Sequence, residues 1–192
     1  MKYLLFIFIL LIISNTCFSQ DIHWSQFNDN PLFQNPGNAG NFNGDVRFVG
    51  NYRDQWRSVT VPFSTINATV DAKLMSNPAI GAGLMLFHDA VGDGKFRTTE
   101  IQANLSYQFK LSSDSMHTIR PGVNIGMNHR QLVFNNFYFD NQYDGISFNP
   151  GLPTGELLTS DKKTNFSIGV GAVYNYYRDK RFKFTAGVGV FN

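Results

Sequence analysis

Histidine is the side chain in this sequence most able to bind a metal ion or transfer a proton near neutral pH. There are four, His23, His88, His117 and His129, and none has the His-x-x-His or Glu-x-x-His spacing of a zinc site. His88 precedes Asp89 as in part of a hydrolase triad, but no Gly-x-Ser-x-Gly motif presents a nucleophilic serine. We therefore predict no catalytic residue, no metal ligand and no cofactor, and interpret the histidines as turn or interface residues.

Two acidic segments also contain glycine, and each offers a pair of carboxylates to a cation. Calcium would bind through Asp89 and Asp93, or through Asp140 and Asp144. Neither segment matches a twelve-residue calcium loop with its terminal glutamate, and Asp-Gly is first of all a turn signal. The sequence predicts turns here and leaves calcium binding open.

The composition narrows the class of protein. The net charge is only +2 and the basic residues are scattered, so we predict no nucleic-acid partner. Aromatic residues make up 15% of the chain, yet its mean hydropathy is −0.19. A β-barrel that faces lipid outside and water inside has this combination.

Residues 1–19 have the pattern of a cleaved secretory signal peptide. Lys2 precedes an apolar run, and Ser19 is a small residue at the end of a polar region. The run is shorter than the roughly 20 residues of a transmembrane helix. Cys17 lacks the apolar residues that precede a lipid-attached cysteine, so we expect cleavage after Ser19. The mature chain would then contain no cysteine for a disulfide bond or a thiolate site.

From about residue 45 apolar and polar residues alternate with the period of a two-sided strand. The pattern predicts seven strands, near 45–57, 63–75, 79–88, 97–110, 118–132, 164–177 and 181–191. Short connections alternate with mostly longer ones, as in outer-membrane barrels with periplasmic turns and external loops. We predict an all-β fold, an antiparallel up-and-down transmembrane β-barrel of the outer-membrane type over residues 45–192. A secreted β-sandwich would alternate in a similar way.

The predicted strand count is odd, whereas single-chain bacterial barrels have even counts. The sequence also stops within an apparent strand, so we expect an N-terminal portion of a closed barrel, truncated to about seven strands. Inside it, Arg53 and Arg57 of the first strand are expected to face the lumen and to pair with Asp71. Glycines that share one face of a strand are expected to stack across strands and allow curvature.

Two aromatic-rich segments are candidates for binding partners. One is the irregular segment 20–44, with Trp24, Phe27 and Phe33. Its Asn-Pro turns favour a compact path tucked into the lumen over docking in a partner's groove. The other is the long connection 133–163, which is either a surface docking loop or a plug on the barrel mouth. Its aromatic candidates are Phe134, Phe137, Tyr138, Phe139 and Tyr143.

The start of the chain resembles the PorP/SprF family in the order and spacing of its residues. They are Trp24, Ser25, Gln26, Phe27, Asn35, Pro36, Ala39, Gly40, Asn51, Tyr52, Arg53, Gln55 and Trp56. The resemblance implies a non-enzymatic bacterial outer-membrane component of the type IX secretion and gliding apparatus. Its expected partners are periplasmic secretion components, cargo or adhesins with type IX C-terminal domains, and outer-membrane lipid. The alternatives are a passive outer-membrane pore and a secreted β-sandwich adhesin.

Overall fold

The computed structural model describes residues 27–58, 61–75, 77–92, 94–134, 137–157, 161–178 and 182–192. The predicted signal peptide, residues 1–19, and Trp24 lie outside these ranges, as does Asp93. Among the described residues, no helix is long and apolar enough to cross a bilayer.

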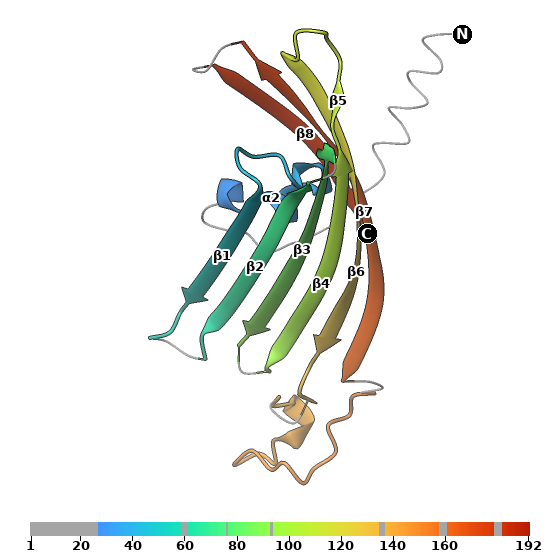
Figure 1. The fold of residues 1–192 in the computed structure, drawn as a ribbon. Coiled ribbons are helices and arrows are strands. Elements are labelled where there is room, and N and C mark those ends of the chain that lie inside the picture. The colour runs from blue at the N-terminus through green and yellow to red at the C-terminus, as the bar shows by residue number, and fades with distance from the viewer. Residues whose placement is uncertain are drawn as a thin grey trace, which may run out of the picture.

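The described strands form one antiparallel sheet (Figure 1). The strands are β1 (Val46–Gln55), β2 (Phe63–Leu74), β3 (Asn77–Val91), β4 (Phe96–Tyr107), β5 (Phe109–Lys110), β6 (His117–Gln131), β7 (Lys162–Tyr177) and β8 (Lys183–Phe191). They pair in the order β1-β2-β3-β4-β6-β7-β8, and the short β5 also pairs with β6. The short β5 continues β4 after Gln108, whose backbone N–H bonds to the Ala79 carbonyl at 2.8 Å. The predicted strand 97–110 therefore corresponds to β4 and β5 together, and the predicted all-β, up-and-down fold is confirmed.

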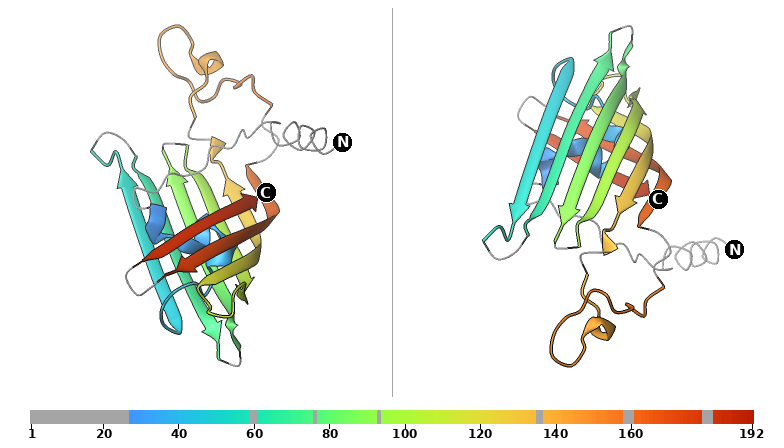
Figure 2. Two further views of the ribbon diagram at one scale, coloured as in Figure 1. Left: turned by 90° about the horizontal axis from the view of Figure 1, so that it is seen from above. Right: turned by 90° about the horizontal axis from the view of Figure 1, so that it is seen from below.

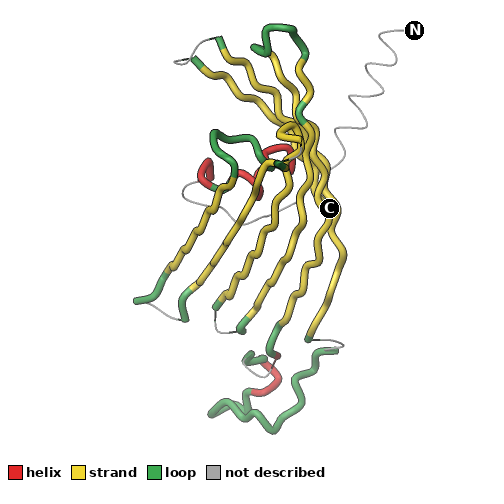
Figure 3. Tube along the Cα trace, in the orientation of Figure 1, coloured by secondary structure: helices red, strands yellow, loops and turns green. Residues whose placement is uncertain are grey.

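The sheet is strongly curled. Figure 2 shows β7 and β8 crossing over the N-terminal helical turns, with β1 to β4 on the other side of them. The tube in Figure 3 follows the same curl, with the helical turns on its concave face. A β-sandwich has two facing sheets, whereas the described strands here form a single sheet with a concave lumen face.

The two faces of the sheet are the reverse of those in a water-soluble domain. Apolar side chains lie exposed on the convex face, among them Phe48, Leu84 and Phe166, while the buried positions of the concave face are mostly polar. The alternation along each strand puts every second residue on each face. An exposed apolar band this extensive marks a surface that meets lipid or another apolar partner.

The connections leave the sheet at two ends. At one end the chain passes from β2 to β3, from β5 to β6 through residues 111–116, and from β7 to β8; at the other it passes from β1 to β2, from β3 to β4 and from β6 to β7. We call the second the loop end and the first the turn end. The connection 92–95 is shorter than the turn 111–116, so the predicted contrast in length comes mainly from the segment 132–161.

Candidate functional site: the lumen and the long loop

The N-terminal segment forms three short helical turns on the concave face of the sheet. They are η1 (Phe27–Asp29), α2 (Pro31–Gln34) and η2 (Pro36–Asn38). Pro31 and Pro36 begin the second and third turns, where the fixed φ of proline suits a helix and its missing N–H costs nothing. The Asn35 side chain accepts a 2.8 Å hydrogen bond from the Gly37 N–H and so caps η2. The two Asn-Pro pairs therefore set a tight, kinked path.

This path fits against a row of small residues, which we call the glycine row. It runs in register across β3, β4, β6, β7 and β8 and consists of Gly81, Ser106, Gly122, Gly171 and Gly189. A Cβ atom at Gly81 would lie 2.1 Å from the Ala39 carbonyl oxygen, and one at Gly122 would lie 2.4 Å from the Gly37 nitrogen. The glycines therefore provide the space that residues 35–40 occupy. Besides allowing the expected curvature of the sheet, the glycines therefore have a second structural role.

Hydrogen bonds from the sheet satisfy the backbone of the inserted segment. The Ala39 carbonyl accepts bonds from Ser106 Oγ at 2.6 Å and from an Arg120 Nη atom at 2.7 Å. Arg120 is fully buried, and its second Nη donates to the Ala79 carbonyl and to Gln108 Oε1. On the opposite wall, Asn35 Nδ2 donates to the Val188 carbonyl at 2.8 Å. Because buried carbonyls need such partners, these contacts hold the segment in one position.

A buried ion pair between Arg47 and Asp71 contacts the end of the inserted segment at Gly40. Arg47 donates to the Asp71 carboxylate through Nε at 2.9 Å and through Nη2 at 2.8 Å, and Asp71 also accepts a hydrogen bond from the Gly40 N–H at 2.7 Å. Asp71 therefore does face the lumen, but its expected pairing with Arg53 or Arg57 was wrong. The strand register places Arg47 opposite Asp71 and Arg53 opposite Thr65, while Arg57 pairs with Asp54 at 2.8 Å.

Apolar side chains complete the fit. Leu32 is fully buried and approaches Gly83, where an added Cβ would lie 2.9 Å from the leucine Cδ1. Phe33 packs against Met85 and Phe87 of β3, with 6.0 Å between the centroids of the two phenylalanine rings. Residues 30–40 therefore lie on the lumen wall, as the Asn-Pro turns predicted. Phe27 remains about half exposed.

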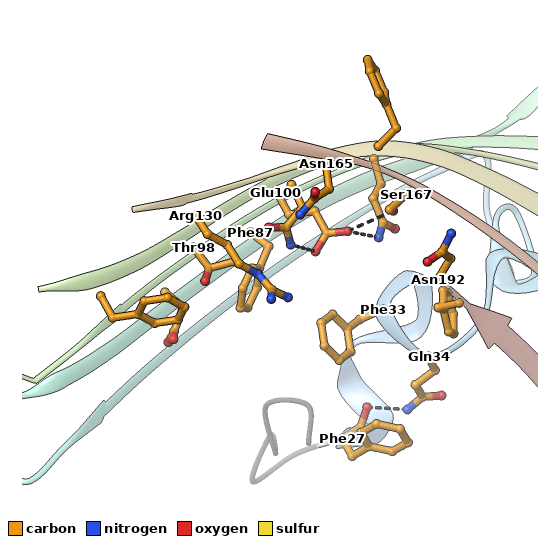
Figure 4. Close-up of a pocket in the computed structure, with 16 residues that line it drawn as sticks. Phe27, Phe33, Gln34, Phe87, Thr98, Glu100, Arg130, Asn165, Ser167 and Asn192 are labelled. Carbon is orange, nitrogen blue, oxygen red and sulfur yellow. Dashed lines mark hydrogen bonds between the residues drawn. The ribbon is translucent and has the colours of Figure 1, made fainter. Parts of the chain in front are cut away.

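A cavity of about 760 Å³ remains between this segment and the loop-end half of the lumen wall (Figure 4). Phe27 and Phe33 line one side; Glu100 and Arg130 lie on the other. The Glu100 carboxylate accepts hydrogen bonds from Gln102, from Asn128 and from Ser167. Within the described residues, no three His, Cys, Asp or Glu side chains converge as metal ligands.

The comparison with protein families covers nearly all of the chain. A family model described as "Type IX secretion system membrane protein PorP/SprF" matches residues 16–192. The chain belongs to the PorP/SprF family. No curated protein and no solved structure matches it. Four of the residues that carried the sequence resemblance, Asn35, Pro36, Ala39 and Gly40, are the ones inserted against the glycine row in this PorP/SprF chain.

The long loop of this family member has structure of its own. Tyr143 and Phe148 form an antiparallel bridge, which closes a hairpin whose tip is Asp144–Ser147. Asp144 Oδ1 accepts the N–H groups of Ile146 and Ser147 at 2.9 and 2.8 Å. The Tyr138 ring meets the Phe148 ring edge-on at 4.6 Å between centroids. The loop therefore presents a preorganised tip.

The predicted aromatic candidates on this loop differ in exposure. Tyr138 and Tyr143 are exposed, Phe137 is about one-third exposed, and Phe134 and Phe139 are half-buried. Ile146, which is 89% exposed at the hairpin tip, was not among the residues predicted from the sequence. An apolar residue directly after Asp-Gly was the signal that could have identified it, since such a turn projects the next side chain.

The hairpin tip predicts a pH dependence. Hydrogen bonds from the N–H groups of Ser147 and Ile146 lower the pKa of Asp144 from its ordinary value of 3.8. Because the folded pKa lies below the unfolded one, the contribution of these bonds is complete above the ordinary value. It is lost as the pH falls through the lower folded pKa.

We expect the amide protons of Ile146 and Ser147 to lose their protection from hydrogen exchange in that acidic window, after correction for the intrinsic exchange rate. The Asp144→Asn variant keeps an acceptor oxygen and should show no such step. Protection that is equally pH-dependent in D144N would contradict this account of the tip.

Proposed function

We propose that this chain is a non-enzymatic outer-membrane component of the type IX secretion system that supports the secretion or surface anchoring of cargo proteins. The cargo would carry type IX C-terminal domains. The family match supports a membrane role in this secretion system. The exposed apolar band on the convex face supports insertion of the strands in the outer membrane.

The observation that carries the proposal is the position of residues 30–40 on the lumen wall. A passive pore would need a wide channel lined by Asn67, Asp71 and the polar residues near them. Here Asn67 Nδ2 donates to Asn30 at 2.9 Å, and Asp71 binds the Gly40 N–H. Residues 30–40 therefore occupy space that a channel would leave open, which favours a binding role over solute diffusion.

The long loop is the proposed cargo site. The loop exposes Tyr143 and Ile146 on the hairpin and Tyr138 beside it, and aromatic and aliphatic anchors of this kind dominate binding energy at interfaces. The hairpin bridge and the Asp144 contacts fix the tip before binding, so little conformational entropy is lost on docking. Phe134, Phe137 and Phe139 would support the base of the same loop.

The segment 20–44 is the proposed contact with periplasmic components. Its inserted part lies against the wall near the turn end, where Arg120 joins it to Ala79 and Gln108. Phe27 is exposed beside it and is, with Trp24, the proposed partner-binding side chain, while Phe33 serves packing. If turns face the periplasm, as is usual for such barrels, this arrangement presents the segment to the secretion machinery.

The test of the cargo site is the Ile146→Asp variant of the full chain, alone and with Tyr138→Ala. We expect the variant to release cargo into the medium and to weaken capture of a cargo C-terminal domain by about 30-fold, since loss of a central anchor costs about 2 kcal/mol. The matched control is Leu157→Asp, a side chain that is 95% exposed on the same loop but outside the hairpin.

Deleting residues 133–163 provides a second arm that does not depend on one side chain. Cargo retention that is unchanged in both I146D and the deletion would rule out the loop as the cargo site. An equal loss in L157D would show that the charge introduced, not the hairpin tip, causes the effect.

A further inference from the structure

The two borders of the apolar band on the convex face differ in chemistry. At the turn end the outward positions are mainly aromatic: Tyr107, Phe109, Tyr174, Tyr176 and Phe184. The rings of Tyr107 and Phe109 lie 4.7 Å apart, and His117 stacks on Tyr176 at the same separation. Aromatic side chains are typical of a membrane interface because their rings are amphipathic. The membrane interface therefore accounts for the aromatic side chains at this border.

At the loop end the outward positions of β4 to β7 are mainly basic and hydroxylic, whereas the register puts Asp54 of β1 in the same row as Arg97, three strands away. The innermost polar row runs in register from β3 to β7 through His88, Thr99, His129 and Thr164. The next row toward the loops contains Arg97, Gln131 and Lys162. The neighbouring row toward the apolar band contains Leu86, Ile101, Met127 and Phe166. The outward side chains therefore change from apolar to polar from one row to the next.

The basic residues of the strands are distributed unevenly between the convex face and the lumen face of the sheet. Arg97 and Lys162 are the strand cations that occupy convex-face positions in the part of the chain that the structure describes. The others, from Arg47 on β1 to Lys183 on β8, occupy lumen-facing positions. No Asp or Glu occurs in the two polar rows between β3 and β7. The patch therefore has a net positive charge at the edge of an apolar surface.

The side chains between the cations are held in place. His88 Nδ1 contacts Thr99 Oγ1 at 2.9 Å, and His129 Nδ1 contacts Thr164 Oγ1 at 2.8 Å. Each ring is thereby fixed by its Nδ1 atom, which leaves Nε2 as the atom for an outside ligand. Strand β6 separates Arg97 from Lys162, so their backbones lie about 10 Å apart. A phosphorylated headgroup that sits over Thr99 and His129 would lie between the two cations.

We propose that this patch, Arg97 and Lys162 with His88, Thr99, His129 and Thr164, binds the phosphate groups of an anionic lipid whose acyl chains cover the apolar band. Charge complementarity selects the occupant, because phosphate is the anion that arginine, lysine and imidazole donors bind best at a membrane surface. The continuity of the patch with the apolar band favours a lipid over a soluble anion. The site is separate from the lumen and from the hairpin tip of the long loop.

The test uses the full chain extracted from the membrane and bis-phosphorylated lipid A as the probe, with binding measured by native mass spectrometry. We expect Arg97→Gln to weaken binding about fivefold and the double variant with Lys162→Gln about 30-fold, at about 1 kcal/mol for each cation. The matched control is Lys163→Gln, which removes the same charge one residue further along but at a lumen-facing position. It should bind as the wild type does.

Three outcomes would overturn the proposal. They are equal binding of lipid A after its phosphates are removed, an equal loss in K163Q, and inorganic phosphate binding alone as tightly as the lipid. Comparison of the circular dichroism of R97Q/K162Q with that of K163Q separates lost binding from lost folding. If the double variant fails to fold, Arg97→Lys replaces it, since it keeps the charge and should retain most of the binding.

Discussion

Replacing Gly81 with alanine is expected to expel residues 35–40 from the lumen and to destabilise the protein by about 3 kcal/mol, the upper end of the usual cost of overpacking. The added methyl group would lie 2.1 Å from the Ala39 carbonyl oxygen and 2.9 Å from the Gly40 nitrogen. Both are backbone atoms that Arg120 and Asp71 hold in place, so neither can move alone. The segment as a whole must then leave the wall.

Limited proteolysis of the full chain would detect the expulsion. Chymotrypsin should cut after Leu32 and Phe33 in Gly81→Ala but not in the wild type. The matched control is Gly50→Ala on β1, where an added Cβ would have no atom within 4 Å. Protection from chymotrypsin that is the same in G81A and G50A would mean that the segment does not depend on the glycine row.

The positions of the strands were predictable from the sequence because one face of each strand meets an apolar environment and the other a polar one. Apolar and polar residues therefore alternate with period 2. The strand expected at 118–132 is observed at His117–Gln131, and the one expected at 164–177 at Lys162–Tyr177. The strand expected at 79–88 extends to Asn77–Val91. The prediction ended this strand too early because Asp89 was interpreted as a turn residue. In the structure the Asp89 carboxylate accepts a 2.7 Å hydrogen bond from Thr65 Oγ1 on the neighbouring strand.

The contents of the lumen were only partly predictable. The Asn-Pro turns indicate a compact segment because proline fixes local geometry, and that part needs no knowledge of the sheet. Which side chain meets Asp71 depends on the register of β1 against β2. Arg47 and Arg53 lie on the same face of β1, and the alternation of apolar and polar residues does not show which of them stands opposite Asp71. Likewise, a glycine on one face of a strand shows that space exists there, but not which distant segment fills it.

Replacing Asp71 with alanine is expected to lower the free energy of unfolding by about 3–5 kcal/mol, the usual cost of leaving one partner of a buried ion pair without the other. The Asp71 side chain is fully buried and that of Arg47 is 21% exposed. The substitution leaves the Arg47 guanidinium in a site with little water and removes the acceptor of the Gly40 N–H. Urea unfolding of the full chain in lipid vesicles measures the loss.

The chain contains a matched control for this prediction. Asp54 also pairs with an arginine at 2.8 Å, but the Arg57 side chain is 78% exposed, so Asp54→Ala should cost less than about 1 kcal/mol. The double variant Arg47→Ala/Asp71→Ala should lose less stability than the sum of the two single variants, because no uncompensated charge remains. If D71A costs no more than D54A, the ion pair does not hold the segment. The glycine row and Arg120 would then have to do so, and the Arg120→Ala variant would show the larger loss.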